Sequence, residues 1–313
     1  MRFNRIYQLT NEPKVYFSCG SKFWNELKGH QKEKSFLITH PMWYFSFSSL
    51  SHFLKLKKML KAKNIDLILF NNSKEEHLFA KFFGFESYHI NQNLNVNEHI
   101  FKPLGLKKEF DCVYTAQAKP FKRIHLAEKI KSLFIITMCK GEHRNPNGSY
   151  NIGMYEPRVN HAKCNETRID SEEVNKILNQ SKIGLALSAK EGAMLAFVEY
   201  LLAGIPVVTT KSKGGRDHYI NKSFVKTIKS DPDQVKMAVE ELIERDISPE
   251  LIRNKTLEII SAERRKFFDV VKKISKTDES YLDFSNRVWG SKFSWADNCI
   301  YEIKDDYAKI KID

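Results

Sequence analysis

The sequence predicts an α/β protein with parallel, doubly wound sheets, and three observations support this fold class. Of the 313 residues, 42% are hydrophobic and 28% are charged, which is typical of folded globular proteins. Short apolar runs that suit buried strands alternate with stretches of helical period. Repeated units of strand and helix imply a parallel sheet covered by helices. The length allows two domains of ordinary size or one large domain.

The first third of the chain alternates between helix and strand. Its periodicity predicts a helix at Ser49–Lys63, a strand at Ile65–Phe70 and a second helix at Lys74–Phe83. A short extended stretch follows at Tyr88–Asn91. Gly84 ends the second of these helices. A polar connection then leads to Pro103 and a charged loop, so we expect a domain boundary near residue 105.

Beyond residue 105 the alternation becomes regular. Strands are expected at Asp111–Thr115, Leu133–Thr137, Ile183–Leu187 and Pro206–Thr209. Helices are expected at Lys122–Ser132, Ser171–Asn179, Met194–Ala203 and in two stretches from Asp233 to about Lys272. Residues 140–168 are too long for a simple connection, so they form either a loop of the site or a poorly ordered segment.

The formal net charge of +13 is concentrated near the N-terminus. Residues 1–63 contain twelve Lys or Arg and only three acids, Glu12, Glu26 and Glu33. Such an excess favours an anionic partner, which is a nucleic acid, an acidic membrane surface or a phosphate-bearing substrate. A lysine-rich proteome would produce the same excess without any partner.

Several classes of protein and site are excluded. No apolar run approaches the roughly 18 residues that span a bilayer, and the N-terminus lacks an apolar signal core. The five cysteines are scattered, without a Cys-x-x-Cys pair, so we expect a reducing, cytoplasmic compartment. The usual dinucleotide, phosphate-loop and zinc-protease motifs are absent. Asp231 and Asp233 precede a helix, where capping is the better explanation, and we expect neither a metal nor a cofactor.

The most informative segment is Ser188–Thr210, in which a strand end, a loop, a helix, a stop and a strand follow one another. Gly204 and Pro206 end the helix. Glu199 lies at the edge of the buried stripe of that helix, where a carboxylate is costly unless something binds it. An amphipathic helix that carries acids by chance is the alternative explanation.

Ligands of open parallel sheets bind beyond the carboxyl ends of the strands, and this segment brings Glu191 and Gly192 there. Gly192 permits a close approach to the backbone. The free N–H groups at the start of the next helix, at Ala193 and Met194, can hold a diphosphate. Glu199 lies about 9 Å farther along, at roughly 1.5 Å per residue, which suits a ligand with a sugar at one end and a ribose at the other.

Glu191, seven residues, Glu199 and the following Ala-Gly-Ile-Pro-Val-Val resemble the signature of retaining glycosyltransferase family 4. The resemblance covers roughly residues 90–245 and implies the GT-B fold, with two Rossmann-like doubly wound domains facing a cleft. The N-terminal domain is shorter than is usual in that family. The resemblance further implies that Glu191 contacts the donor sugar and Glu199 the ribose hydroxyls.

A second patch, Val113–Ala127, resembles the strand, loop and basic helix start of the same family. The resemblance implies that Lys122, with Arg123 beside it, neutralises the donor diphosphate and the charge on the leaving phosphate. A basic pair that opens a helix is otherwise ordinary solvated surface. Asn91–Pro103 resembles the interdomain strand and Lys213–Asp217 a glycine-containing turn, although each could equally be an ordinary connection.

The resemblance implies a hexosyltransferase-like enzyme, retaining and metal-independent, with Lys122, Arg123 and Glu191 as its catalytic residues. It transfers a sugar from a nucleotide-sugar donor to a glycan or lipid-linked acceptor in cell-surface polysaccharide synthesis. We expect an acceptor-side domain at residues 1–105 and a nucleotide-sugar-binding domain at residues 106–285. Residues 286–313 are expected to form a segment that packs back on the first domain.

Two other interpretations stay open. A non-catalytic protein of the same fold, peripheral to the inner face of the membrane or part of an assembly, would bind anionic lipid through its basic N-terminal domain. Its support is the lysine-rich helix after Pro41–Phe47, for which plain packing on the sheet is the alternative. A nucleic-acid partner rests on charge alone and is the weakest interpretation. His40, His52 and His77 are acceptor-side candidates or structural residues.

Overall fold

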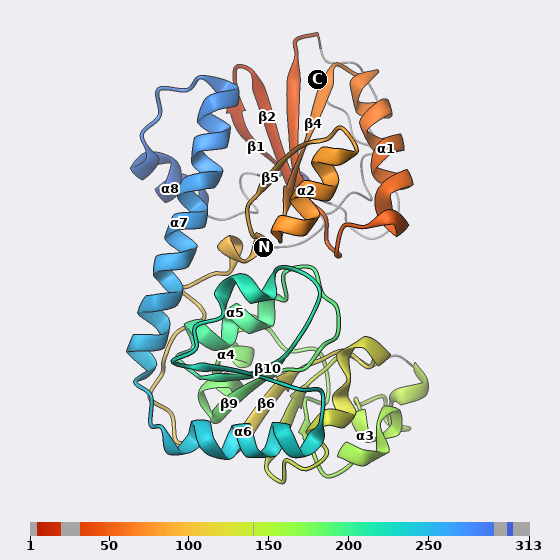
Figure 1. Cartoon of the computed structure of the whole chain (residues 1–313), viewed down its shortest axis with the longest axis vertical. Helices are drawn as coiled ribbons and strands as arrows, with labels where there is room; N and C mark the ends of the chain where they lie inside the picture. The colour runs from red at the N-terminus through yellow and green to blue at the C-terminus, as the bar shows by residue number, and fades with distance from the viewer. Residues whose placement is uncertain (1–4, 20–31, 140, 291–298, 303–313) are drawn as a thin grey trace. The chain divides into compact units, whose positions relative to one another are not determined.

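The computed structural model describes residues 5–19, 32–139, 141–290 and 299–302, which divide into two compact units (Figure 1). Unit 1 combines residues 1–95 with residues 260–313, and unit 2 consists of residues 96–259. Each unit contains a six-stranded sheet. In the part of the chain that is described, none of the helices has the length and apolar character needed to cross a bilayer.

Unit 2 has the strand order of a Rossmann fold. Its strands are β6 (Phe110–Thr115), β7 (Leu133–Ile136), β8 (Lys163–Cys164), β9 (Ser181–Ala186), β10 (Val207–Thr210) and β11 (Val225–Ile228). They are all parallel and lie in the order β8-β7-β6-β9-β10-β11. The helices of the unit are α3 (Ile152–Tyr155), α4 (Ser171–Asn179), α5 (Leu195–Leu202) and α6 (Pro232–Glu244). The direction of winding reverses between β6 and β9, which marks the position where such sheets bind ligands.

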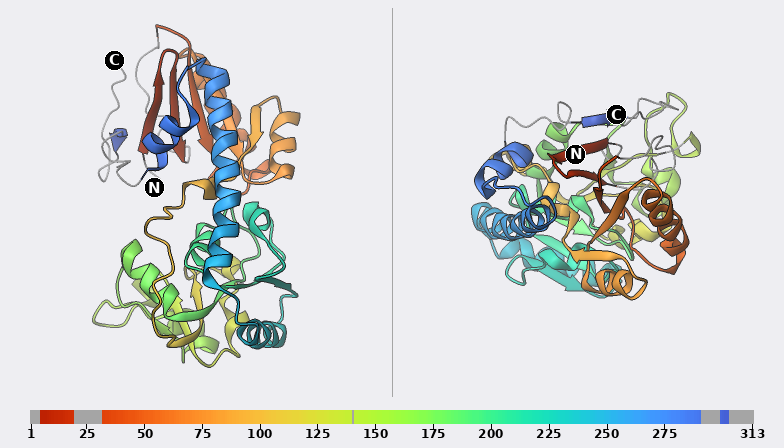
Figure 2. Two further views of the ribbon diagram at one scale, coloured as in Figure 1. Left: turned by 90° about the vertical axis from the view of Figure 1, so that its left-hand side faces the viewer. Right: turned by 90° about the horizontal axis from the view of Figure 1, so that it is seen from above.

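Unit 1 is wound differently. Its elements are β1 (Arg5–Asn11), β2 (Lys14–Cys19), β3 (Ser35–His40), α1 (Phe47–Lys61), β4 (Ile65–Asn71), α2 (Lys74–Phe82), β5 (Glu86–His89), α8 (Tyr281–Trp289), β12 (Cys299–Glu302) and the second half of α7 (Pro249–Ser275). Strands β2 to β5 are parallel neighbours in chain order, and β1 pairs antiparallel with β2 and β12. Because right-handed crossovers in one direction place their helices on one face, α1 and α2 lie side by side (Figures 1 and 2).

The two faces of the unit 1 sheet bury separate cores. Alternate strand residues such as Leu37 and Leu69 pack against the inner face of α1, at Phe53, Leu56 and Leu60. The residues between them face the other way, because side chains alternate along a strand. These strand residues, Ile38, Ile68 and Phe70, pack in one core with Phe267 and Val271 of α7 and with Phe284 and Trp289 of α8. The sheet is therefore covered on both sides, by helices from opposite ends of the chain (Figure 1).

The domain boundaries differ from those expected. The division lies at residue 96 rather than near 105, and residues 260–285 belong to unit 1 rather than to the second domain. The physical reason is the apolar stripe on the second half of α7, where Phe267 contacts Phe17 and Phe70 of the unit 1 sheet at ring-centroid distances of 5.1 and 5.3 Å. Of the expected last segment, residues 286–289 lie in α8 and 299–302 form β12, while the remainder lies outside the described residues.

Most expected elements occur, but the helix at Lys122–Ser132 is wrong. Two short 3-10 turns, Pro120–Lys122 and Ile124–Ala127, replace it, because Arg123 between them has the left-handed φ of 50°. Residues 140–168 contain α3 and the edge strand β8. Strands β1 to β3 and β11 were not predicted from the sequence. Asp231 caps α6 as expected, accepting the N–H of Gln234 at 3.0 Å.

We predict that Phe267→Ala lowers the free energy of unfolding of unit 1 by about 3–5 kcal/mol, because it opens a cavity among aromatic rings. The matched control is Leu282→Ala on α8, whose side chain is exposed and whose loss should cost at most about 0.5 kcal/mol. Urea unfolding followed by tryptophan fluorescence reports both. An equal cost for the two variants would show that α7 does not cover this sheet.

Candidate functional site

The candidate site lies at the carboxyl ends of β6 and β9, where the winding of unit 2 reverses. The loop after β6 contains Lys122 and the loop after β9 contains Glu191. The two loops are joined directly, because the N–H of Ala189 donates to the carbonyl of Phe121 at 2.8 Å. Residues that are remote in the sequence therefore meet at the edge where a parallel sheet binds its ligand.

Lys122 and Glu191 form an ion pair in this position. The distance from Nζ to Oε1 is 2.5 Å, and the side chains are only 13% and 9% exposed. The hydroxyl of the buried Tyr114 donates to the carbonyl of Lys122 and so holds the loop against the end of β6. A buried ion pair is expensive to form and adds little net stability, so its presence points to a task beyond folding. The ammonium has three donors, of which Glu191 uses one, and the others can bind phosphate oxygens.

The loop of Glu191 is held by a second loop, after β10. The N–H of Glu191 donates to the carbonyl of Lys213 at 3.0 Å, and the N–H of Gly215 donates to the carbonyl of Gly192 at 2.7 Å. Gly214 lies between them with φ 122° and ψ −166°, a conformation essentially restricted to glycine. A Cβ there would lie 2.1 Å from the carbonyl oxygen of Glu191. The glycine turn at 213–217, which alone was a weak signal, is thus required for the close approach of the two loops.

Two arginines bind the ends of the strands beneath these loops. Arg216 is fully buried and donates to the carbonyls of Ala186, at 2.7 Å, and Thr210. Arg123 donates from Nε to the carbonyl of Leu187 at 2.6 Å and from Nη2 to the hydroxyl of Thr210 at 2.6 Å. The side chain of Arg123, expected to act on the donor phosphates, is therefore engaged with strand ends. Sequence reasoning missed Arg216, whose only signal was its place in the glycine turn.

Helix α5 begins at the same edge. Met194 precedes it with a left-handed φ of 54°, and Gly192, Ala193 and Met194 are all buried. The helix is fixed to the sheet by Tyr200, whose hydroxyl accepts the N–H of Thr115 at 2.6 Å. The positive end of α5 is consequently placed at the carboxyl edge, as the sequence predicted, where it favours an anion.

Glu199 lies one turn into α5. Burial raises the pKa of its carboxyl to about 7, although its side chain keeps partial access to solvent. Within the described part of the chain, no hydrogen bond or ion pair engages this carboxylate. Glu191 has a cationic partner, whereas Glu199 has none among the described residues, so the two acids of the motif have different environments. A half-buried carboxylate without a partner is suited to accept hydrogen bonds from ligand hydroxyls.

The three histidines named as acceptor-side candidates belong to unit 1. His40 is fully buried between Phe17 and Phe70, at ring-centroid distances of 5.9 and 5.5 Å, and burial lowers its pKa to about 3. His77 Nδ1 lies 3.0 Å from the hydroxyl of Ser87, and burial lowers its pKa. The ring of His52 packs on that of Phe53 at 5.4 Å. Each of these contacts is of a structural kind.

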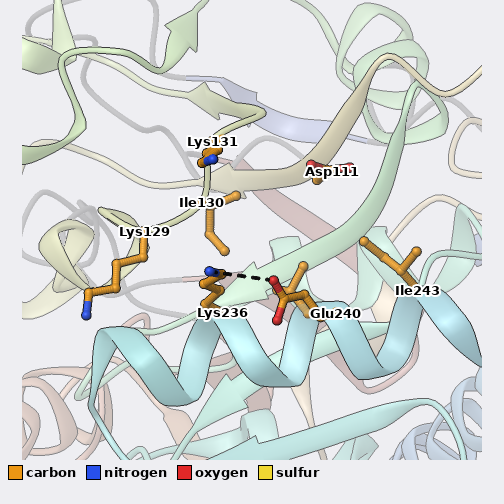
Figure 3. Close-up of a pocket in the computed structure, with 8 residues that line it drawn as sticks. Asp111, Lys129, Ile130, Lys131, Lys236, Glu240 and Ile243 are labelled. Atoms are coloured by element: carbon orange, nitrogen blue, oxygen red, sulfur yellow. Dashed lines mark ion pairs between the residues drawn. The ribbon is translucent and has the colours of Figure 1, made fainter.

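A pocket of about 210 Å³ lies at the opposite, amino-terminal edge of the unit 2 sheet (Figure 3). It is lined by Asp111 at the start of β6, by Lys129, Ile130 and Lys131 before β7, and by Lys236, Val239, Glu240 and Ile243 of α6. Its charges are largely paired, as between Lys236 and Glu240 at 3.8 Å and between Asp111 and Lys182 at 2.8 Å. Because it lies at the amino ends of the strands, we do not assign it to the candidate site.

We predict that Gly214→Ala lowers the stability of unit 2 by roughly 2–5 kcal/mol, through a disfavoured backbone and a clash with the Glu191 carbonyl. Gly148→Ala is the matched control, because Gly148 also has a positive φ, of 82°, but nothing lies within 4 Å of its added Cβ. The control should cost about 1 kcal/mol. Urea denaturation measures both, and similar costs would contradict the role assigned to Gly214.

We predict that Glu199→Gln changes the dependence of stability on pH. The folded protein holds the Glu199 proton more tightly than the unfolded chain, so this group stabilises the fold below pH 4.5 and loses its contribution as the pH rises through about 7. Relative to wild type, the variant should therefore gain roughly 1–2 kcal/mol between pH 5 and pH 8, allowing for partial exposure. Urea unfolding across this range tests it. The exposed Glu244→Gln should show no such gain, and a flat difference for Glu199→Gln would refute the prediction.

Comparison with known proteins agrees with this geometry. Residues 167–258 match the family model described as glycosyl transferases group 1. The matched segment runs from just before α4 into α7 and includes both Glu191 and Glu199, whereas Lys122 precedes it. Among curated proteins, none matches the sequence.

Three solved structures illustrate the similarity of fold. HepE of Anabaena in complex with UDP is 13% identical, with a TM-score of 0.57 over 76% of this chain and 72% of that one. The sucrose-phosphate synthase of Thermosynechococcus elongatus is 12% identical, with a TM-score of 0.57 over 77% and 68%. TarM is 14% identical, with a TM-score of 0.60 over 82% of this chain and 54% of that one.

At these identities the structural likeness establishes the fold, and it confirms the predicted GT-B class with two Rossmann-like domains. The family match confirms the predicted resemblance to group 1 glycosyltransferases and supports a glycosyltransferase enzyme. The chain is thus an α/β protein of GT-B fold that carries a glycosyl transferases group 1 segment at residues 167–258.

Proposed function

We propose that the chain transfers a sugar from a nucleoside-diphosphate sugar, with the donor held at the carboxyl edge of the unit 2 sheet. The observation that carries this proposal is the buried Lys122–Glu191 ion pair at the point where the winding of a Rossmann sheet reverses. A lysine with free donors and the positive end of α5 together suit a diphosphate. HepE, which has a similar fold, has been solved with UDP and with UDP-glucose, which supports a nucleotide sugar as the donor.

Each residue of the expected set has a proposed role. Lys122 and the start of α5, at Gly192 to Met194, hold the diphosphate. Glu191 orients Lys122 through their ion pair and contacts the donor sugar, and Glu199 accepts hydrogen bonds from the ribose hydroxyls. Arg123 acts as a positioning residue, because its guanidinium is bound to the ends of the strands beneath the site.

The chemistry that such a site performs is transfer to a hydroxyl. The acceptor oxygen forms a bond to the anomeric carbon while the bond from that carbon to the donor phosphate breaks. The acceptor proton passes to the departing phosphate oxygen. Negative charge collects on the diphosphate, where the Lys122 ammonium and the α5 dipole stabilise it. Retention of configuration and independence of metal ions are proposed from the family resemblance of Glu191 and Glu199.

The acceptor is proposed to be a glycan or a lipid-linked precursor of a cell-surface polysaccharide, on the strength of the same resemblance and of the basic N-terminal region. The rival interpretation, a non-catalytic protein of this fold, predicts no binding of a nucleotide sugar. The paired Lys122 and Glu191 support the enzyme, because they hold a cation at the edge of the sheet where a donor diphosphate would bind.

We predict that one class of nucleoside-diphosphate sugar, out of UDP-, GDP- and ADP-linked donors, stabilises the chain against heat in the absence of added metal, and that CMP-linked donors, which have a single phosphate, do not. Lys122→Ala should weaken binding of that donor roughly 10- to 100-fold, since it removes charge-assisted hydrogen bonds. Lys131→Ala, the same change at the amino-terminal edge of the sheet, should leave the affinity unchanged. Calorimetric titration measures the three dissociation constants.

A loss of binding in Lys122→Ala could arise from the unpaired carboxylate that remains. The double variant Lys122→Met/Glu191→Gln removes both charges with little change in volume, so it distinguishes the two causes. If the double variant binds the donor as tightly as wild type does, the ion pair has no role in recognition. If none of the donors stabilises the wild-type chain, the non-catalytic interpretation replaces the proposal.

A further inference from the structure

We propose that the outer faces of α1 and α2 in unit 1 form a surface that docks on an anionic phospholipid bilayer. We call this surface the α1–α2 outer face. Its apolar members are Phe47, Leu54, Leu78 and Phe82, and its basic members are Lys55, Lys58, Lys61, Lys74 and Lys81. The inference concerns unit 1 and does not rest on the proposed function, which depends on residues of unit 2.

Large apolar side chains on this face are unusually exposed. Phe47 is 74% exposed, Leu78 64% and Phe82 83%. Of the three exposed Phe and Trp side chains among the described residues, Phe47 and Phe82 lie here, and Trp43 lies in the connection that precedes α1. Scattered single apolar residues on a surface are normal, but a concentration of aromatic residues marks a surface with a partner.

The exposed aromatic residues belong to one cluster that joins the two helices. The ring of Phe47, at the start of α1, packs against Phe79 at 4.9 Å and Phe83 at 5.7 Å. Phe82 packs against Phe83 at 5.1 Å. The two most exposed rings therefore flank the same pair of half-buried rings, and the patch is continuous from α1 to α2.

Helical geometry separates this face from the core. The buried residues of α1 are Phe53, Leu56 and Leu60, which point at the sheet. At about 100° per residue, Phe47 and Leu54 lie on the opposite side, together with Lys58. On α2 the same geometry turns Leu78 and Phe82 away from the buried Glu76 and Ala80. These apolar residues are thus additional to the stripe that the fold buries.

The charge of the face fits an anionic surface. Residues 47–63 contain five lysines and no acid, and the exposed residues of α2 add Lys74 and Lys81 against one acid, Glu75. Lys55 and Lys58 are exposed and have no acidic partner within the described residues, whereas Lys61 is paired with Asp66 at 2.9 Å. Lysines near an anionic bilayer contribute about 1 kcal/mol each, and aromatic rings enter the interface between headgroups and acyl chains. A second copy of the chain fits less well, because it would bring lysines opposite lysines.

The test is co-sedimentation of the full chain with vesicles at physiological salt, where exposed charges are partly screened. One set of vesicles contains phosphatidylcholine alone, and the other contains equal parts of phosphatidylcholine and phosphatidylglycerol. We expect binding to the anionic vesicles only. Binding to neither set, or equal binding to both, would overturn the proposal.

Two variants address the two kinds of contact. Lys55→Ala/Lys58→Ala should lower the partition constant about 30-fold, from about 1 kcal/mol per lysine. Phe47→Ser/Phe82→Ser should lower it at least about tenfold, because apolar area no longer leaves water. The matched controls are Lys222→Ala/Lys229→Ala and Met237→Ser/Leu282→Ser, which change exposed residues elsewhere and should bind as wild type does.

Thermal unfolding confirms that the variants fold, which we expect because the altered side chains are exposed. If the lysine pair matters and the phenylalanine pair does not, the partner is a polyanion such as nucleic acid, and the bilayer proposal fails. The proposal also fails if a control pair loses as much binding as its counterpart. Loss in both test pairs with intact controls supports it.

Discussion

The guanidinium of Arg216 binds carbonyl oxygens at the ends of β9 and β10, and the geometry of the candidate site depends on this contact. Buried backbone carbonyls need hydrogen-bond donors, and at these two strand ends Arg216 supplies one to each. Burial lowers the pKa of Arg216 to about 10, so the group stays charged at neutral pH and tolerates no loss of its acceptors. The strand ends, and with them the loop of Glu191, are consequently held in one arrangement.

A feature of the fold or of the site could be predicted when the residues that determine it lie close together in the sequence. Helix α4 was predicted with its observed bounds, and α5, β9 and β10 within one or two residues, because periodicity and stop signals such as Gly204 act within the segment itself. Glu191 and Glu199 were found for the same reason. The glycine turn that contains Gly214 was only a weak signal, and Arg216 was missed, since the partners of both lie in other loops. The helix expected from Lys122 failed because Arg123 adopts a left-handed backbone while its side chain binds three separate strand connections, which no local pattern reveals.

The same distinction explains the division of the chain. Periodicity predicts helical structure throughout α7, but not which sheet a given turn covers. Arg253, in its first half, donates to the carbonyls of Phe101 and Leu202 of unit 2, at 2.6 and 3.0 Å. Phe267, in its second half, packs into the aromatic core of unit 1. One helix thus contacts unit 2 through its first half and the core of unit 1 through its second half, and only the side chains of each half show which unit that half contacts.

Helices α1 and α5 use apolar surface differently, and this difference bears on what unit 1 binds. Helix α5 exposes no large apolar side chain, because its apolar residues are buried against the sheet of unit 2. In α1 the residues Phe53, Leu56 and Leu60 already pack against the sheet of unit 1. Phe47 and Leu54 nevertheless remain exposed on the side of Lys58, which has no acidic partner among the described residues. Stability of the fold gives no reason for these residues, since exposed aromatic surface only favours association. The partner that we propose for them is apolar at one level and anionic at the next, which is the profile of a phospholipid interface.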